Sequence, residues 1–344
     1  MKHLSRLFFF AAFSLVTFLW GQTQEFPVQK ITLLLASVET AGTRAMNALD
    51  MPQIPSFTTE PAWTEEQIAS ASPVKALAMI EENMARARQG MEVRNGIAME
   101  TFRAQKKHME GVMAKLQGTR FGSQILLALD KFSGFAGECF DPDCLEFFHR
   151  MDTETLMQEA FVGDKPVDLA SGTYFLKLVF DNPHEEKTDG YVAGTHITRH
   201  KYRQKLTFQV QDMSGKMITA GNITKDKSIT SGDVTSTQGQ GDGVLVELVE
   251  ECLRETAQRI NDFFVSKVTV KLVSSRKGDQ EFNADAATLT VDGVEQMTDT
   301  EFSLLKGKHL FCVELDGYAQ KGTALRKVGK NGTIKIVLSP EEAQ

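Results

Sequence analysis

The chain has 344 residues, of which 42% are hydrophobic and 24% are charged, and its formal net charge is −7. These values are typical of a globular protein, and the length is sufficient for two domains that each bury a core. The acidic balance argues against a nucleic-acid partner and against adhesion to anionic lipid, because both need a clustered basic surface.

The first residues have the pattern of a secretory signal peptide, which we predict to occupy residues 1–21. Lys2 and Arg6 precede an apolar run, Leu7–Trp20, that has the length of a signal-peptide core and is short for a membrane helix. Leu19 is larger than the residue that a cleavage site prefers at this position, so an uncleaved anchor stays an alternative.

The predicted location of the mature chain is the periplasm or the outer cell envelope. No cysteine follows the apolar run, so the acylation site of a lipoprotein is missing, and no later segment is apolar enough to span a bilayer as a helix. The chain from residue 22 onward keeps 36 of the 38 Lys and Arg and all 45 Asp and Glu, which gives a formal charge of −9. We therefore expect envelope proteins as partners, and no nucleic acid.

The chain has four cysteines, and an exported protein meets conditions in which disulfides form. Cys139 and Cys144 flank a proline-containing turn, and their spacing allows a disulfide that closes a small loop, although spacing alone does not determine connectivity. Metal binding by this pair has less support, because no second Cys or His pair lies at zinc-site spacing. Cys252 and Cys312 are expected to be small buried residues of a helix and a strand.

The N-terminal third is predicted to contain a strand, a loop and helices. Gln29–Val38 is an apolar run that indicates a buried opening strand, and three prolines indicate an irregular loop over Met51–Pro61. Thr64 and Gln67 form a capping-box pattern at the start of a helical segment, which we interpret as an insertion over residues 64–117.

The segment Pro73–Leu116 is rich in helix-forming residues. Its apolar residues make two stripes with Gly90 and Gly96 between them, so we predict two helices or one bent helix. The heptad pattern fails at several positions, which argues against a coiled coil. The methionines of both stripes are typical of core packing, and an adaptable partner-binding face is the alternative.

Five further elements are predicted up to Gly194, in the order helix, strand, helix, strand and polar insertion. They are Phe121–Lys131, Ser133–Phe140, Asp152–Glu159, Gly172–Asp181 and Asn182–Gly194. The second strand, GTYFLKLVFD, has the stronger signal.

A hairpin and a long helix follow. Lys205–Gln211 alternates apolar and polar residues, and the turn DMSG joins it to a second strand, Lys216–Lys225. A loop rich in Gly, Ser, Thr and Gln covers Thr230–Gly243. The helix is predicted over Gly243–Phe264, with Asp242 as its N-cap.

Residues 267–344 have the pattern of a small antiparallel β domain. Asp292 and Gly293 mark a turn, Lys306–Lys308 is a break before the strand HLFCVEL, and a second turn follows at DGY. The dipeptide Asn-Gly between LRKVGK and TIKIVL is a strong signal for a two-residue hairpin.

The alternation of strands and helices over residues 22–266 predicts an α/β domain. Several stretches resemble the envelope domain shared by the curli-secretion protein CsgG and the penicillin-binding-protein activator LpoB; these are ITLLLASV, ILLALDKFSGFAGECFD, ETLMQEA, ASGTYFLKLVFD, LTFQVQDMSGKMITAG and VELVEECLRETAQRINDFF. The resemblance implies a three-layer-like α/β domain with the helical segment inserted. The acylated N-terminal cysteine of those proteins is missing here, and so are clear transmembrane hairpins of a secretion pore.

The C-terminal segment resembles the PEGA-type β domains of bacterial envelope proteins, in its order of strand, VDG turn, L..G.H...V...GY motif and strand. The tetrad that gives that family its name is absent, and TDTEF stands near its place. This resemblance implies a non-catalytic β-sandwich, so the whole chain is expected to be an α+β protein of two domains.

Candidate metal ligands are few. His196 and His200 share one face if GTHITRHKY is a strand, and they could bind a metal with His184 or Glu185; an exposed polar strand edge is the alternative. The acidic residues of GECFDPDCLEF could hold calcium, but the EF-hand order is missing, which favours a solvated turn.

Signatures of catalysis are missing from the sequence. Gly239, Gly241 and Gly243 precede a helix in the manner of a phosphate-binding loop, but the lysine of that motif is absent. No nucleophile elbow or zinc-protease motif is present, and no pair of carboxylates can be placed in a cleft. We therefore expect no catalytic residue, no cofactor and no metal.

The sequence thus predicts an exported, non-catalytic envelope protein that binds or scaffolds other envelope proteins through strand edges and helix faces. The exposed edges of the hairpin Lys205–Lys225 and of the C-terminal sheet are the expected surfaces. An oligomeric component of an outer-membrane secretion or assembly complex is one alternative, and a cell-wall hydrolase, for which no motif is present, is another.

Overall fold

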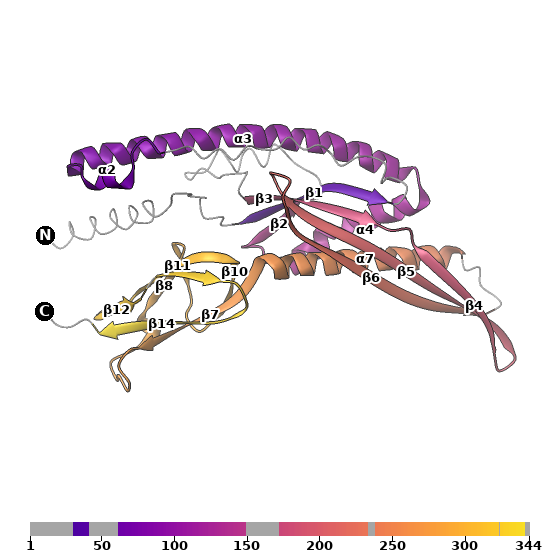
Figure 1. Ribbon diagram of the computed structural model, residues 1–344. Coiled ribbons are helices and arrows are strands. Elements are labelled where there is room, and N and C mark those ends of the chain that lie inside the picture. Colours follow the sequence, from indigo (N-terminus) through magenta and orange to yellow (C-terminus); the bar gives the residue numbers. More distant parts are fainter. Residues whose placement is uncertain (1–29, 41–60, 149–171, 233–237, 323, 341–344) are drawn as a thin grey trace.

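The computed structural model describes residues 30–40, 61–148, 172–232, 238–322 and 324–340 (Figure 1). The predicted leader at 1–21, most of the proline-containing loop and the predicted helix Asp152–Glu159 lie outside the described residues. Helices and strands are mixed along the chain, as an α+β fold requires.

A six-stranded sheet lies at the centre of the N-terminal part, in the order β2-β1-β3-β5-β4, with β6 paired to β5. Its strands are β1 (Ile31–Thr40), β2 (Leu145–Phe148), β3 (Thr173–Phe180), β4 (His184–Val192), β5 (Thr195–Asp212) and β6 (Met217–Gly232). The pairs of β1 with β2 and β3 are parallel, whereas β5 is antiparallel to β3, β4 and β6.

Helices cover both faces of this sheet and make the predicted three layers (Figure 1). Leu34 of β1 packs with residues of α3 (Pro73–Gln117), whereas its neighbours Leu33 and Leu35 point to the opposite face and pack with α4 (Arg120–Cys139) and α7 (Gln238–Phe264). Successive side chains of a strand point to opposite faces, so an uninterrupted apolar run such as ITLLLASV is what a strand covered on both sides requires.

Helix α3 is one continuous helix of 45 residues, about 68 Å long at 1.5 Å per residue. The alternative of two helices is therefore wrong, and the helix is gently curved (Figure 1). A glycine inside a helix costs only about 1 kcal/mol relative to alanine. Buried side chains before and after Gly90 and Gly96, such as Ile80 and Ala98, outweigh that cost. The short α2 (Glu65–Ala69) precedes α3 and starts with the predicted capping box of Thr64 and Gln67.

Two sequence predictions around the sheet are wrong. Ser133–Phe140 is not a strand, because α4 continues to Cys139 and buries Phe132, Phe135 and Ala136 at helical spacing. The polar insertion Asn182–Gly194 is largely the strand β4, which has no apolar alternation because nearly all of its side chains are exposed.

The central strand β5 is longer than predicted and carries a projecting ribbon. Its second half pairs with β3 and its first half with β4, while β6 runs beside it over nearly the whole length. At the point where β3 ends, the buried Gln204 side chain donates a hydrogen bond to the carbonyl oxygen of Asp181, 2.9 Å away. We call β4, β6 and the part of β5 between them the ribbon; it extends beyond the other strands, with α7 along one face (Figure 1).

The C-terminal part is a sandwich of two four-stranded sheets, in the orders β10-β7-β14-β12 and β13-β11-β8-β9. Its strands are β7 (Val265–Ser274), β8 (Thr288–Val291), β9 (Val294–Gln296), β10 (Glu301–Leu305), β11 (Gly307–Glu314), β12 (Tyr318–Lys321), β13 (Leu325–Val328) and β14 (Gly332–Pro340). Val270, Leu289, Phe311 and Ile336 belong to the core between the sheets. All pairs are antiparallel except β7 with β14, which are parallel.

Two of the three turns predicted there are confirmed and the third is wrong. At DGY, Gly317 has a φ angle of 76° and the backbone N–H of Tyr318 donates to the carbonyl of Leu315, 3.0 Å away. Asp292 and Gly293 join β8 to β9, both with positive φ angles of 52° and 84°, as a tight hairpin turn requires. The Asn331-Gly332 hairpin does not form, because β13 pairs with β11 while β14 pairs with β7 and β12 in the other sheet. The Asn331 side chain instead accepts a hydrogen bond from the backbone N–H of Lys267, 2.9 Å away.

The two parts of the chain meet where α7 runs directly into β7. The first ladder pair of the sandwich, Val265 with Leu305, packs in the core of the N-terminal part rather than in that of the sandwich. Lys306 also donates from its backbone N–H to the carbonyl of Phe264, 2.7 Å away. The predicted domain boundary at residue 267 stays a prediction.

Candidate docking surface

The ribbon has one covered and one open face. Even-numbered residues of β5, such as Tyr202 and Leu206, point toward α7 and are buried. Odd-numbered residues, such as Arg199 and Arg203, point the other way and are exposed. The helix α3 covers the continuation of this open face only near β1 and β3, where Phe175 packs against it.

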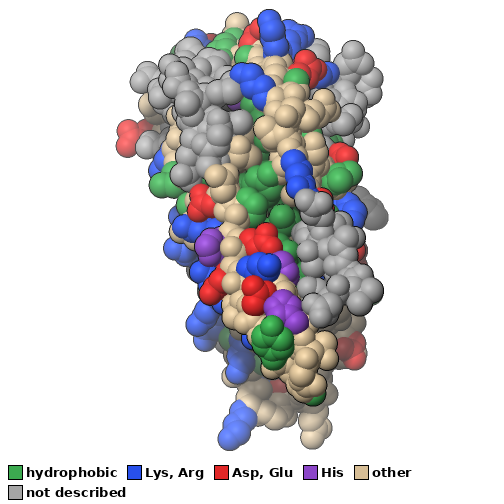
Figure 2. Space-filling model, turned by 90° about the vertical axis from the view of Figure 1, so that its right-hand side faces the viewer, with side chains coloured by type: hydrophobic (Ala, Val, Ile, Leu, Met, Phe, Trp, Pro, Cys, Tyr) green, Lys and Arg blue, Asp and Glu red, His purple; other side chains and the backbone are tan. Residues whose placement is uncertain are grey.

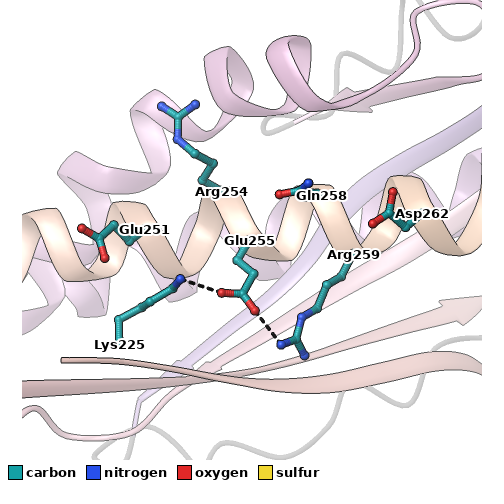
Figure 3. A pocket seen from close by; sticks show the side chains of 7 residues that line it. All are labelled: Lys225, Glu251, Arg254, Glu255, Gln258, Arg259 and Asp262. Carbon is teal, nitrogen blue, oxygen red and sulfur yellow. Dashed lines mark hydrogen bonds and ion pairs between the residues drawn. The ribbon is translucent and has the colours of Figure 1, made fainter.

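Salt bridges hold α7 against β6. Glu255 lies between Lys225, 2.7 Å away, and Arg259, 2.5 Å away (Figure 3). The hydrogen bond between Lys225 and Glu255 raises the pKa of the Lys225 amine and lowers the pKa of the Glu255 carboxyl. Lys227 is bound in the same way by Glu247. The charges that point inward from β6 are therefore neutralised by the helix.

An open groove of about 410 Å³ runs along this part of α7 (Figure 3). It is lined by Lys225, Glu251, Arg254, Glu255, Gln258, Arg259 and Asp262. Three cations and three anions line it, so it has no net charge to select a charged ligand. Arg254 points away from the β6 side toward α4, where it pairs with Glu138 and lies 4.5 Å from the centre of the Phe135 ring. We assign the groove to the packing of α7 rather than to a ligand.

The outer edge of β6 is open: β6 pairs only with β5, and no described strand lies on its other side. Two contacts fix the orientation of its backbone. Arg259 of α7 donates to the carbonyl of Asn222, 3.1 Å away, so this carbonyl points away from β5. Lys205, the partner of Thr224 on β5, turns its carbonyl away from β6, because it accepts from the N–H of Asp181 at 3.1 Å.

Backbone groups in an antiparallel pair alternate between pointing to the partner and pointing away. The backbone N–H and C=O groups of Asn222 and Thr224 point away from β5. Those of Asp226, Ser228 and Thr230, which follow at every second position, point away from β5 as well. The side chains of all five are exposed and small, which leaves room for another strand beside them. This edge therefore has the geometry of a template for strand addition.

The other free edge of the ribbon, β4, differs in its chemistry. Five of its residues are acidic, basic or histidine: His184, Glu185, Glu186, Lys187 and Asp189. Charged side chains on an edge strand are a common protection against pairing with other chains. Between Thr224 and Thr230, only Asp226 gives the β6 edge this kind of protection, because Lys225 and Lys227 are bound by glutamates of α7.

The candidate histidine ligands of β4 and β5 do not meet at one point. His200 Nδ1 lies 2.7 Å from Glu185 Oε1, which also accepts from the Tyr202 hydroxyl at 3.1 Å. His196 lies nearer Asp189, and His184 is the neighbour of Arg203 on the opposite face of the ribbon. Figure 2, a view from the end of the ribbon, shows histidine side chains among acidic and basic ones rather than around a common point.

Within the described residues, no group of three His, Cys, Asp or Glu side chains is arranged to hold a metal ion. The acidic residues near Cys139 and Cys144 are divided among different partners. Glu138 pairs with Arg254, and Glu146 lies 2.8 Å from Lys30.

All four cysteines are free thiols in the structure. Cys139 lies at the end of α4 and is partly exposed, whereas Cys144 is buried just before β2. The disulfide between them stays a prediction.

The glycine-rich segment before α7 lies largely inside that helix, which begins at Gln238. The N-cap prediction for Asp242 is wrong, because this residue lies one turn inside the helix. Its carboxylate binds Arg120 at 2.6 Å and Gln124 at 2.7 Å, which connects the starts of α4 and α7. The side chain of Asp242 is thus used in helix packing.

The sequence identified the hairpin but missed the part of the ribbon beyond Lys205 and Lys225. The segment RHKYRQK alternates basic with buried residues, and this alternation is the signal for the first half of β5. Likewise, ITKDKSIT alternates across the free part of β6. The expected edges of the sandwich exist but are shorter: β9, β10, β12 and β13 have three to five residues each.

Known proteins offer limited guidance. No protein-family model matches the sequence. No curated protein matches it. The resemblance to CsgG, LpoB and PEGA domains therefore stays a prediction.

Several solved structures overlap part of the chain. A minor lipoprotein from Acinetobacter baumannii has 14% identity and a TM-score of 0.26, over 42% of this chain and 87% of its own. A homologue of a neuraminyllactose-binding hemagglutinin from Helicobacter pylori has 7% identity and a TM-score of 0.26, over 70% and 87%. A hypothetical protein from Chlamydia trachomatis has 10% identity and a TM-score of 0.21, over 67% and 96%. These scores are too low to carry an argument about function.

None of the helices in the described part of the chain combines the length and the apolar character that crossing a membrane requires.

Proposed function

We propose that this chain is a non-catalytic docking protein of the cell envelope, which binds another envelope protein by strand addition to the outer edge of β6. The mature chain would act in the periplasm or the outer envelope after removal of the leader at 1–21. Residues 22–266 would form the docking domain, and residues 267–344 would extend or orient the contact.

The contrast between the two free edges of the ribbon carries this proposal. The edge of β4 is crowded with charged side chains, whereas the edge of β6 presents a row of outward backbone groups that pair with no described strand and lie beside small polar side chains. An added strand gains affinity from main-chain hydrogen bonds and specificity from alternate side chains. Helix α7 backs this edge from one face, where it is held by ion pairs with Lys225 and Lys227.

A proline substitution tests the docking edge. The N–H of Ser228 points away from β5, so Ser228→Pro removes an outward donor without removing a hydrogen bond of the β5–β6 ladder. Ser228→Ala keeps that donor and serves as the matched control. Each mature variant is used as bait on a native envelope extract, and captured proteins are quantified by mass spectrometry.

We expect the proline variant to lose a protein that the wild-type and alanine baits both capture, by about tenfold or more, which corresponds to about 1.4 kcal/mol. The unfolding midpoints of the variants are compared to verify that the ribbon is intact. Equal capture by the alanine and proline baits would show that strand addition at β6 is not the mode of binding.

A further inference from the structure

We infer that the strand accepted by β6 carries carboxylates at alternate positions. This inference rests on the proposed function, because it names the chemical class of the partner at that same edge. The occupant is thus an extended acidic segment of another protein.

A row of basic side chains lies one strand away from the free edge. Arg199, Lys201, Arg203 and Lys205 alternate along β5 and share the open face of the ribbon. Side chains two residues apart on a strand are separated by about 7 Å, and neighbouring strands by about 4.8 Å. An added strand would have the same repeat, so each second side chain on it would face this row across β6.

The strand β6 lies between the basic row and the position of an added strand, and its side chains on the open face are short enough for longer side chains to reach across them. On the open face, β6 presents only short side chains opposite the basic row, among them Ser228 and Thr230. The Arg199 guanidinium already leans across, with Nη2 3.5 Å from the Ser228 hydroxyl oxygen. Long cationic side chains on β5 thus reach toward the edge where a strand would add.

The acids already present on this face leave part of the row unneutralised. Arg203 is bound by Asp226, with Nε 2.7 Å from Oδ1, and Lys205 lies 3.6 Å from Asp181. Glu186 of β4 is the cross-strand neighbour of Lys201, on the side away from β6. Among the described residues, Lys201 is within ion-pair distance of no carboxylate, and Arg199 contacts only a hydroxyl on this face.

Charge complementarity therefore selects the partner. The added strand would lie two strand spacings from β5, about 10 Å, so each contact has to be made by a long Arg or Lys side chain that reaches across β6 to a carboxylate, and like charges in these places would repel. A strand with two carboxylates spaced two residues apart would meet Arg199 and Lys201 together. A strand with lysines there would be repelled, and this repulsion adds to specificity.

A second copy of the chain fits this edge less well. The open face of β6 itself carries a single acid between Thr224 and Thr230, namely Asp226, and that acid is already bound by Arg203. Two β6 strands side by side would thus bring no new carboxylate to Arg199 and Lys201. Self-association and lipid binding are kept as outcomes of the test.

Three capped, fluorescent heptapeptides serve as probes for the mature chain. The first alternates threonine with glutamate, the second alternates threonine with lysine, and the third has the composition of the first with its glutamates adjacent. Binding is measured by fluorescence anisotropy at low and high salt. We expect the alternating acidic peptide to bind about tenfold more tightly than either of the others, and less tightly at high salt.

Charge reversal supplies the matched control. Arg199→Glu with Lys201→Glu should transfer the preference to the lysine peptide. Lys308→Glu with Lys327→Glu, an equal charge change on exposed residues of the sandwich, should leave the preference as it is. Both double variants are compared with the wild type by their unfolding midpoints.

The outcomes separate this inference from the proposed function. Equal binding of the peptides, or binding of none at millimolar concentration, overturns the acid preference; the proposed function stands if Ser228→Pro still abolishes partner capture. Binding to phosphatidylglycerol vesicles that needs Arg199 and Lys201 and ignores Ser228→Pro would assign the basic row to lipid. A dimer in sedimentation that Ser228→Pro dissociates would assign the edge to a second copy.

Discussion

His309 and Asp292 form an ion pair at one corner of the C-terminal sandwich, with Nδ1 2.6 Å from Oδ2; the histidine is buried and the aspartate is partly exposed. The second ring nitrogen lies 2.6 Å from the carbonyl oxygen of Leu305. Both partners accept hydrogen bonds, so the ring satisfies both of them when both of its nitrogens carry protons, which favours the imidazolium form. The other oxygen of Asp292 accepts from the N–H of Leu310 at 2.8 Å, which anchors the β8–β9 turn to β11.

The stability of the sandwich should depend on pH through this pair. Burial lowers the pKa of His309, but the hydrogen bonds to Asp292 and Leu305 and the charge of Asp292 outweigh it, so the pKa is raised above 6.5. A raised pKa contributes stability that is complete below the unfolded value and is lost as the pH rises through the folded value. Arg326, its cross-strand neighbour on β13, is the other charged group in register with His309.

We therefore expect the free energy of unfolding of the sandwich to fall as the pH rises above about 6.5, the pKa of an unfolded histidine, in denaturant titrations. Asp292→Asn should weaken this dependence while it keeps an acceptor for Leu310. His184→Gln, on the exposed edge of β4, is the control and should leave the slope unchanged. A slope that is the same in the Asp292 variant would contradict the assignment.

Gly221 is required by the packing of Phe208 across the ribbon. A Cβ at position 221 would lie 2.6 Å from the Phe208 ring, which is itself buried. Gly221→Ala should thus destabilise the chain by about 1–3 kcal/mol, the usual range for overpacking. Gly190→Ala is the control on the same ribbon, because a Cβ there meets nothing within 4 Å. Equal unfolding midpoints for the two variants would contradict the contact.

The α4 helix should depend on Phe132, which is fully buried and packs edge-to-face on Phe147 with ring centres 4.6 Å apart. Phe132→Ala should cost about 3–5 kcal/mol in chemical denaturation, because it leaves a cavity. Leu127→Ala on the same helix, with a side chain that is 59% exposed, should cost much less. A small effect at Phe132 would place this segment outside the core.

The buried thiols should resist alkylation in the folded chain. Burial raises the pKa of both the Cys144 and the Cys252 thiols to about 12, so the reactive thiolate is scarce at neutral pH. We expect iodoacetamide to modify Cys139 first and these two only after unfolding, as peptide mass spectrometry would show. Rapid modification of Cys252 in the native chain would contradict its buried position on the inner face of α7.

The predicted pairing of Cys139 with Cys144 is tested on the same chain without reductant. A disulfide would appear as one cross-linked peptide and would protect both residues from alkylation. Two separately alkylated peptides after unfolding would rule the pairing out for the purified protein.

The sequence predicted elements well where the local pattern and the tertiary contacts agree. The Asp292-Gly293 turn formed because its backbone requirement is local, and Leu206 and Phe208 alternate because only one face of that strand is buried. The segment after Lys131 was misread, because a short apolar run fits a strand or a helix until a neighbouring element buries one side.

The candidate surface was predicted only in part, for a related reason. The hairpin edges were anticipated from alternation, but β4 has no alternation of apolar and polar residues to mark it, and its pairing is decided by β5. The Asn331-Gly332 signal failed because the following strand joins β7, which is distant in sequence. Which edge remains open is thus a property of sheet order, and sequence patterns of single strands do not contain it.

Hydrogen exchange resolved to single amides is the most direct test of the docking edge. In the free protein, the outward amides of β6 should exchange quickly and the alternate ones slowly; the first set is Thr224, Asp226, Ser228 and Thr230, and the second is Lys225, Lys227 and Ile229. When the captured envelope protein is bound, the first set should become slow as well. Protection that appears on β4 or the sandwich while these amides stay fast would contradict strand addition at β6.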